Sequence, residues 1–129
     1  MISRRGIALI AALSGLSAVI LAAVGSHILL QSGAEAQKLW ATALQIHMFH
    51  TAALLGIAAL IRPGSPRLMP WSGVLMMLGV LLFSGSLYLR AGGFSAVPGL
   101  VTPLGGLLLM AGWLVLIMTL IRKSRLWQP

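Results

Sequence analysis

The 129-residue sequence contains no cysteine, no aspartate and one glutamate, Glu35. Without cysteine, the chain cannot form disulfides, thiolate nucleophiles, Cys-ligated zinc or iron–sulfur sites, or covalent c-type haem. Without a second carboxylate, it lacks essential parts of paired-carboxylate hydrolases, magnesium-dependent phosphoryl transferases and Ser-His-Asp triads. We therefore expect a protein that is not an enzyme.

Charged residues are also scarce, at 8% of the chain against 59% hydrophobic residues, which is too few to cover a soluble domain. They lie in five short patches, and the four stretches between the patches are almost wholly apolar. A helix that crosses the hydrocarbon core of a bilayer needs about 20 such residues. We expect an all-α membrane protein in which residues 1–129 form one domain, a bundle of four transmembrane helices over about 6–27, 39–61, 71–89 and 102–121.

The basic residues are unevenly divided between the two sides of this predicted bundle. The N-terminus, the 62–70 loop and the C-terminus hold seven of them, whereas the other two loops hold only Lys38 and Arg90. Because cytoplasmic loops carry the excess of Lys and Arg, both termini are expected in the cytoplasm. The same bias explains the net charge of +8 without a nucleic-acid partner, since the bases do not line a groove.

Small residues indicate where the spans pack closely, because they let helix backbones approach in a membrane. In the first span a small residue recurs every fourth position from Ser14 to Ser26. This stripe is expected to contact another helix of the bundle, and contact with a second copy of the chain is the alternative. The complete set of predicted packing residues is Ala11, Ser14, Gly15, Ala18, Ala22, Ser26, Gly85, Gly105, Gly106 and Gly112.

Uncharged polar residues gather in the half of the spans opposite the termini. His47 and His50, three residues apart, are expected on one helix face, and Trp113, inside the fourth span, needs a partner for its indole N–H. The predicted polar pocket comprises His27, His47, His50, Thr51, Ser84, Ser86, Tyr88, Thr102 and Trp113.

This polar set has three interpretations. Hydrogen bonds between helices would make it structural. A path or binding pocket for a small molecule, ion or lipid is the second interpretation, weakened by the lack of an intramembrane carboxylate. Ligation of haem or copper by His27 with His47 or His50 is the third. The leading expectation is no metal and no cofactor.

Several strings carry a family resemblance: Gly25-Ser26-His27, Phe49-His50-Thr51, Phe83-Ser84-Gly85-Ser86-Leu87-Tyr88, Thr102-Pro103-Leu104-Gly105-Gly106 and Ala111-Gly112-Trp113. Over nearly its whole length the sequence resembles the small bacterial inner-membrane proteins of unknown function typified by YgdD (domain of unknown function 423), related to animal transmembrane protein 256. The resemblance implies four helices and an inner-membrane location, and no established activity. The family usually has Tyr-Gln where this chain has Ile46-His47, so a mechanism that depends on His47 would be peculiar to this protein.

Together these features predict a multi-pass protein of the bacterial inner membrane with no catalysis of its own. The expected role is a structural or accessory component of a membrane complex. Its expected partners are the lipid bilayer and other membrane-protein subunits or a second copy of the chain. Binding or transport of a small molecule, ion or lipid is the alternative.

Overall fold

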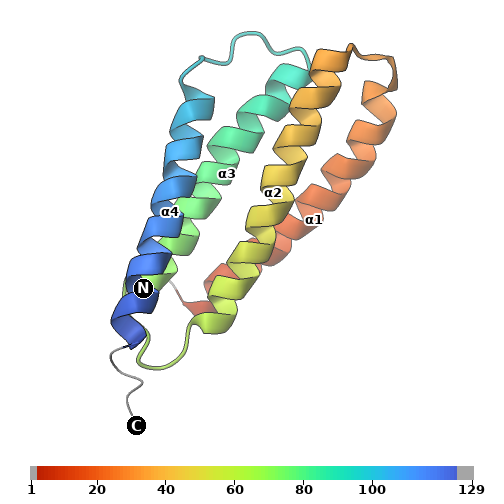
Figure 1. Ribbon diagram of the computed structural model, residues 1–129. Coiled ribbons are helices and arrows are strands. Elements are labelled where there is room, and N and C mark those ends of the chain that lie inside the picture. The colour runs from red at the N-terminus through yellow and green to blue at the C-terminus, as the bar shows by residue number, and fades with distance from the viewer. Residues whose placement is uncertain (1–2, 125–129) are drawn as a thin grey trace.

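The computed structural model describes residues 3–124, which form four long helices joined by short connections (Figure 1). They are α1 (Arg4–Ile28), α2 (Ala34–Leu60), α3 (Met69–Ala91) and α4 (Val101–Ser124), and a 3₁₀ turn, η1 (Leu29–Gln31), follows α1. Each of the four is long and apolar enough to cross a membrane. The expectation of an all-helical protein with four such helices is confirmed. Arg125, counted above among the basic residues, lies outside the described residues.

Local sequence explains where several of these helices begin and end. Ser3 precedes α1, and its hydroxyl accepts the backbone N–H of Gly6 over 3.1 Å, which satisfies a free donor of the first turn. Pro70 occupies the first turn of α3, where its missing N–H costs nothing. Gly64 and Gly93 have φ values of 84° and 92°, so the turns after α2 and α3 use a backbone conformation that favours glycine.

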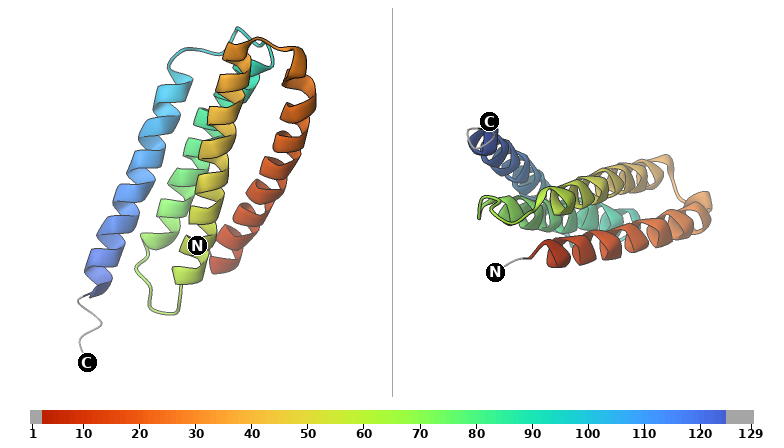
Figure 2. Two further views of the ribbon diagram at one scale, coloured as in Figure 1. Left: turned by 45° about the vertical axis from the view of Figure 1, so that its right-hand side comes forward. Right: turned by 90° about the horizontal axis from the view of Figure 1, so that it is seen from below.

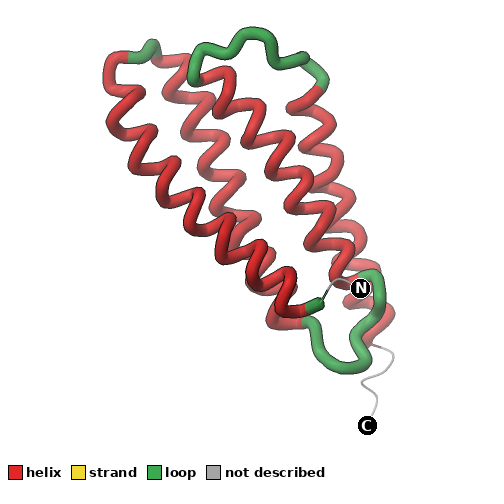
Figure 3. Tube along the Cα trace, turned by 180° about the vertical axis from the view of Figure 1, so that it is seen from behind, coloured by secondary structure: helices red, strands yellow, loops and turns green. Residues whose placement is uncertain are grey.

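The helices run alternately up and down. In Figure 3 the start of α1, the end of α4 and the loop 61–68 lie at one end of the molecule, which we call the terminal end. The loops 32–33 and 92–100 lie at the opposite end. α3 packs against both α2 and α4, and α1 packs mainly against α2. Figure 2 shows α1 and α4 on opposite sides of the α2–α3 pair.

The centre of the molecule at the terminal half is an apolar cluster from all four helices. Its largest fully buried side chains are Ile7, Leu54, Ile57, Met69 and Met76. The seam between α3 and α4 depends on glycine. A Cβ at Gly112 would lie 2.7 Å from Met76 Cγ, and one at Gly105 would overlap the backbone of Phe83.

The structure also locates the other predicted packing residues. Ala11, Ser14 and Ala18 are buried, Ala22 is half-buried, and Ser26 is exposed, so the small-residue stripe leaves the interface at its last member. A Cβ at Gly15 would touch Thr51 at 3.4 Å. Gly106 lies next to Phe83, and the space around Gly85 is open. The stripe therefore packs against α2 inside the molecule over most of its length.

Candidate functional site

The largest hydrogen-bonded group among the predicted polar residues is centred on His47 of α2. Its Nε2 atom lies 3.1 Å from Ser14 Oγ on α1, and its Nδ1 atom lies 3.3 Å from the hydroxyl of Tyr88 on α3. Thr51 Oγ1, one turn further along α2, lies 2.6 Å from Ser14 Oγ. We call Ser14, His47, Thr51 and Tyr88 the histidine network. It joins three helices.

The backbone carbonyl of His47 can only accept a hydrogen bond, and this fixes which atom donates in the other hydrogen bonds of the histidine network. Thr51 donates to this carbonyl over 2.9 Å, so its own oxygen accepts from the Ser14 hydroxyl. The Ser14 oxygen then accepts Nε2–H of His47, and in the neutral imidazole Nδ1 accepts the Tyr88 hydroxyl. In its neutral form His47 is thus assigned the tautomer with the proton on Nε2.

His50, three residues further on, makes a separate contact with α4. Its Nδ1–H donates to the carbonyl of Ile46 over 2.8 Å, and its Nε2 accepts the indole N–H of Trp113 over 3.1 Å. Phe49 packs beside both rings, with centroids 5.2 Å from His50 and 5.9 Å from Trp113. His50 is therefore neutral, with its proton on Nδ1, the opposite tautomer to that of neutral His47.

Hydrogen bonds occupy the ring lone pairs that a metal ion would need in both buried histidines. His27, the third histidine of the chain, is exposed on α1 and stands apart from them. Within residues 3–124, no group of three or more His, Cys, Asp or Glu side chains is placed to hold a metal ion. Ligation of haem or copper would require breaking these hydrogen bonds.

Three hydroxyl groups tie α3 to its two neighbours. Ser84 donates to the carbonyl of Ala43 on α2 over 2.8 Å. Ser86 donates to the carbonyl of Phe83 over 2.9 Å, so its oxygen accepts from Thr102 on α4, 2.6 Å away. Each of these contacts satisfies polar atoms in apolar surroundings, where an unpaired group costs several kcal/mol.

Trp40 makes a contact that the sequence pattern did not predict. Its indole N–H donates to the carbonyl of Leu21 on α1 over 3.1 Å, and its ring meets Tyr88 edge-on at 4.8 Å. A Cβ at Gly25 would overlap the indole, so glycine is what lets Trp40 reach the backbone of α1. Trp40 thereby borders the histidine network on the side away from the termini.

The structure therefore brings the predicted residues into contacts between pairs of helices rather than around one open pocket. His47, Thr51 and Tyr88 belong to the histidine network, His50 bonds to Trp113, Ser86 bonds to Thr102, Ser84 bonds to backbone, and His27 stands apart. In the described part of the chain, every buried side-chain nitrogen or oxygen has a hydrogen-bond partner. An ion or small-molecule path through these residues would require such bonds to open.

Ser14 is a member of this network that the small-residue pattern predicts only as a packing residue. Ser14 and Thr51 are almost equally far along the chain from the turn at 32–33. Two antiparallel helices joined by a short turn place such residues at the same level. That pairing is the signal in the sequence that identifies Ser14 as a polar partner.

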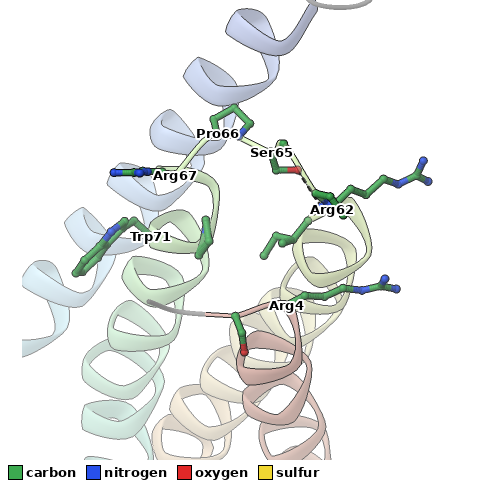
Figure 4. A pocket seen from close by; sticks show the side chains of 11 residues that line it. Arg4, Arg62, Ser65, Pro66, Arg67 and Trp71 are labelled. Atoms are coloured by element: carbon green, nitrogen blue, oxygen red, sulfur yellow. Dashed lines mark hydrogen bonds between the residues drawn. The ribbon is translucent and has the colours of Figure 1, made fainter.

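A second polar feature lies at the terminal end, where the start of α1, the end of α2 and the start of α3 border a pocket of about 730 Å³ (Figure 4). We call it the arginine pocket, because Arg4, Arg62 and Arg67 line it together with Trp71. The other lining residues are Ser3, Ile61, Pro63, Gly64, Ser65, Pro66 and Pro70. In the sequence pattern these arginines indicate only the orientation of the chain in the membrane.

Four apolar helices around a closed set of polar contacts define a multi-pass membrane protein. The DUF423 family, described as a protein of unknown function, matches residues 21–106, and the chain belongs to this family. The resemblance stated above is thus confirmed.

Individual relatives agree. The UPF0382 inner membrane protein YgdD of Escherichia coli (strain K12) is 38% identical over 116 residues, covering 89% of this chain and 88% of that protein. A UPF0382 membrane protein of Staphylococcus saprophyticus is 34% identical over 110 residues, covering 84% and 91%. Another, from Staphylococcus haemolyticus, is 40% identical over 82 residues, covering 64% and 66%. No solved structure matches the chain.

Proposed function

We propose that this protein is a non-catalytic accessory component of a membrane complex in the bacterial inner membrane, with both termini in the cytoplasm. The observation that supports a non-catalytic role most directly is the complete hydrogen bonding of its described buried polar side chains. A catalytic acid, base or metal ligand needs a proton or lone pair that faces its substrate. The two buried histidines use theirs on neighbouring helices.

An accessory role is supported by how little of the described chain lies outside the helices. The connections cover residues 29–33, 61–68 and 92–100, which are too short to hold a soluble domain. Contacts with a partner would be made by these connections or by the helices themselves. Because α1 and α4 lie on opposite sides of the α2–α3 pair, each has an outer face for lipid, another subunit or a second copy.

The proposed orientation is supported by the charges. The terminal end carries Arg4, Arg5, Arg62 and Arg67, whereas Lys38 and Arg90 belong to the opposite end. Because cytoplasmic loops are enriched in Lys and Arg, the terminal end faces the cytoplasm.

Cysteine labelling tests this orientation cleanly, because the chain has no native cysteine. Leu68→Cys and Ser95→Cys each place one thiol at an exposed position, the first in the loop 61–68 and the second in the loop 92–100. In intact cells, a membrane-impermeant maleimide should label only the Ser95→Cys protein. Labelling of the Leu68→Cys protein instead would contradict the proposed orientation.

Affinity capture tests the accessory role. The tagged full-length protein is crosslinked in native membranes, then purified beside an equally tagged unrelated multi-pass protein. We expect a membrane-protein partner in a fixed ratio, recovered only with this chain. A monodisperse monomer that recovers nothing else would contradict the proposal.

A further inference from the structure

The arginine pocket concentrates positive charge that the described protein does not neutralise. Three of its lining residues are arginines and none is acidic. The only carboxylate side chain of the sequence, Glu35, lies in the first turn of α2, at the opposite end of the molecule. Within residues 3–124, the guanidinium groups of Arg4, Arg62 and Arg67 make no hydrogen bond or ion pair. By contrast, Arg90 at the opposite end donates to the carbonyls of its own loop.

Two of these arginines come to the same pocket from segments far apart in sequence. Figure 4 shows the side chains of Arg4, at the start of α1, and Arg62, just after α2, extending in the same direction, outward and away from Trp71. Ser65 holds the turn after α2 by accepting the backbone N–H of Arg62 over 2.9 Å. Two guanidinium groups that leave the pocket on the same side are suited to hold the oxygens of a phosphate group at its rim, because arginine binds phosphate through paired charge-assisted hydrogen bonds.

The rest of the pocket is suited to a lipid rather than to a soluble anion. Its remaining wall is largely apolar, with Ile61 and three prolines, and Trp71 lies exposed beside it at the start of α3. The pocket stands at the ends of three helices long enough to span the bilayer, where the lipid head groups lie. Tryptophan is enriched at this level, and basic pockets between helices there bind acidic head groups. Its volume of about 730 Å³ lies within the usual range of small-molecule sites.

The cavity at the opposite end has a different character. It has a volume of about 470 Å³ between α3, α4 and the loop 92–100, and no charged residue lines it. Of these two pockets, only the arginine pocket is lined by charged residues.

We propose that the arginine pocket binds the phosphate-bearing head group of an anionic phospholipid, with Arg4 and Arg62 as the principal phosphate ligands. The site requires only that the terminal end reach the head groups. With the orientation proposed above, these head groups belong to the cytoplasmic leaflet. The proposal does not depend on an accessory role, and a negative result from affinity capture would leave it standing.

Native mass spectrometry of the purified full-length protein tests the proposal. The protein is incubated with phosphatidylglycerol or with phosphatidylcholine of the same acyl chains, with and without millimolar inorganic phosphate. The test variant is Arg4→Gln/Arg62→Gln, and the matched control is Lys38→Gln/Arg90→Gln, which removes the same charge from the opposite end. Circular dichroism in the same detergent confirms that all three proteins are folded.

The wild-type protein and the control should retain phosphatidylglycerol in preference to phosphatidylcholine. The Arg4→Gln/Arg62→Gln protein should retain at least about tenfold less, because two charge-assisted contacts are lost. Equal losses in both double variants would overturn the proposal in favour of diffuse charge attraction. Equal retention of phosphatidylcholine, or full displacement by inorganic phosphate, would also overturn it, the latter in favour of a soluble anion.

Discussion

The histidine network and the arginine pocket differ in whether their polar groups have hydrogen-bond partners within the described chain. In the network each donor meets an acceptor on the same chain, from the Tyr88 hydroxyl to the carbonyl of His47. In the arginine pocket the guanidinium groups of Arg4 and Arg62 have no partner among the described residues. The difference follows from depth, because hydrocarbon cannot satisfy a polar group whereas water and head groups can. We infer that ligand binding belongs at the membrane edge, and that the interior polar groups stabilise the fold.

Loss of the central imidazole should have the largest effect on stability. His47→Ala leaves the Ser14 and Tyr88 hydroxyls without their shared partner and opens a cavity, at a cost of about 2–3 kcal/mol. Reversible unfolding in mixed micelles measures this cost. His27→Ala, at an exposed histidine, is the matched control and should change stability by less than about 0.5 kcal/mol. Equal effects of the two substitutions would remove the distinction between network and surface.

The contact between α2 and α4 should contribute less. Trp113→Phe keeps most of the aromatic packing and removes the N–H that His50 Nε2 accepts, so unfolding should become easier by about 1 kcal/mol. Nitrogen-15 spectra of the imidazole rings provide an independent check. In the wild-type protein His47 should carry its proton on Nε2 and His50 on Nδ1. The same tautomer in both rings would contradict the assigned hydrogen bonds.

The hydroxyl at the start of the network should contribute less again. Tyr88→Phe removes one donor to His47 and keeps the edge-on contact with Trp40, so the expected cost is about 0.6 kcal/mol, the average for a hydrogen bond inside a membrane protein. The double variant with His47→Ala completes a mutant cycle. If the two costs simply add, Tyr88 and His47 are not coupled and the network does not extend to α3.

The smallest effect on stability is expected at the arginine pocket. Arg62→Gln breaks no hydrogen bond of its side chain within residues 3–124, so unfolding should shift by less than about 0.5 kcal/mol, although lipid retention falls. The measurement is the same unfolding assay in micelles without anionic lipid. A loss as large as that of His47→Ala would make Arg62 a structural residue and end the contrast between the two regions.

The helices could be predicted from the sequence more completely than the contacts between them. Apolar runs and flanking breakers predicted four helices, although α2 begins at Ala34 instead of near residue 39. His47 and His50 share a face of α2 by spacing, yet one bonds toward α1 and α3 and the other toward α4. Helical spacing specifies which residues point the same way, not which neighbour each side chain meets. Side chains of α2 meet α1, α3 and α4, so that choice depended on tertiary packing.

The sequence alone determined that this chain crosses a membrane, because so few charges in so many apolar residues leave no other stable exterior. It also showed which positions within the apolar stretches carry polar side chains. Only the tertiary structure decided that Ser14 completes the histidine network, and that Arg4 and Arg62 line one pocket. Hydropathy is a sum over consecutive residues, so it can be calculated from the sequence without knowledge of the fold. A hydrogen bond or a shared pocket depends on ångström-scale distances between separate helices, which packing alone determines.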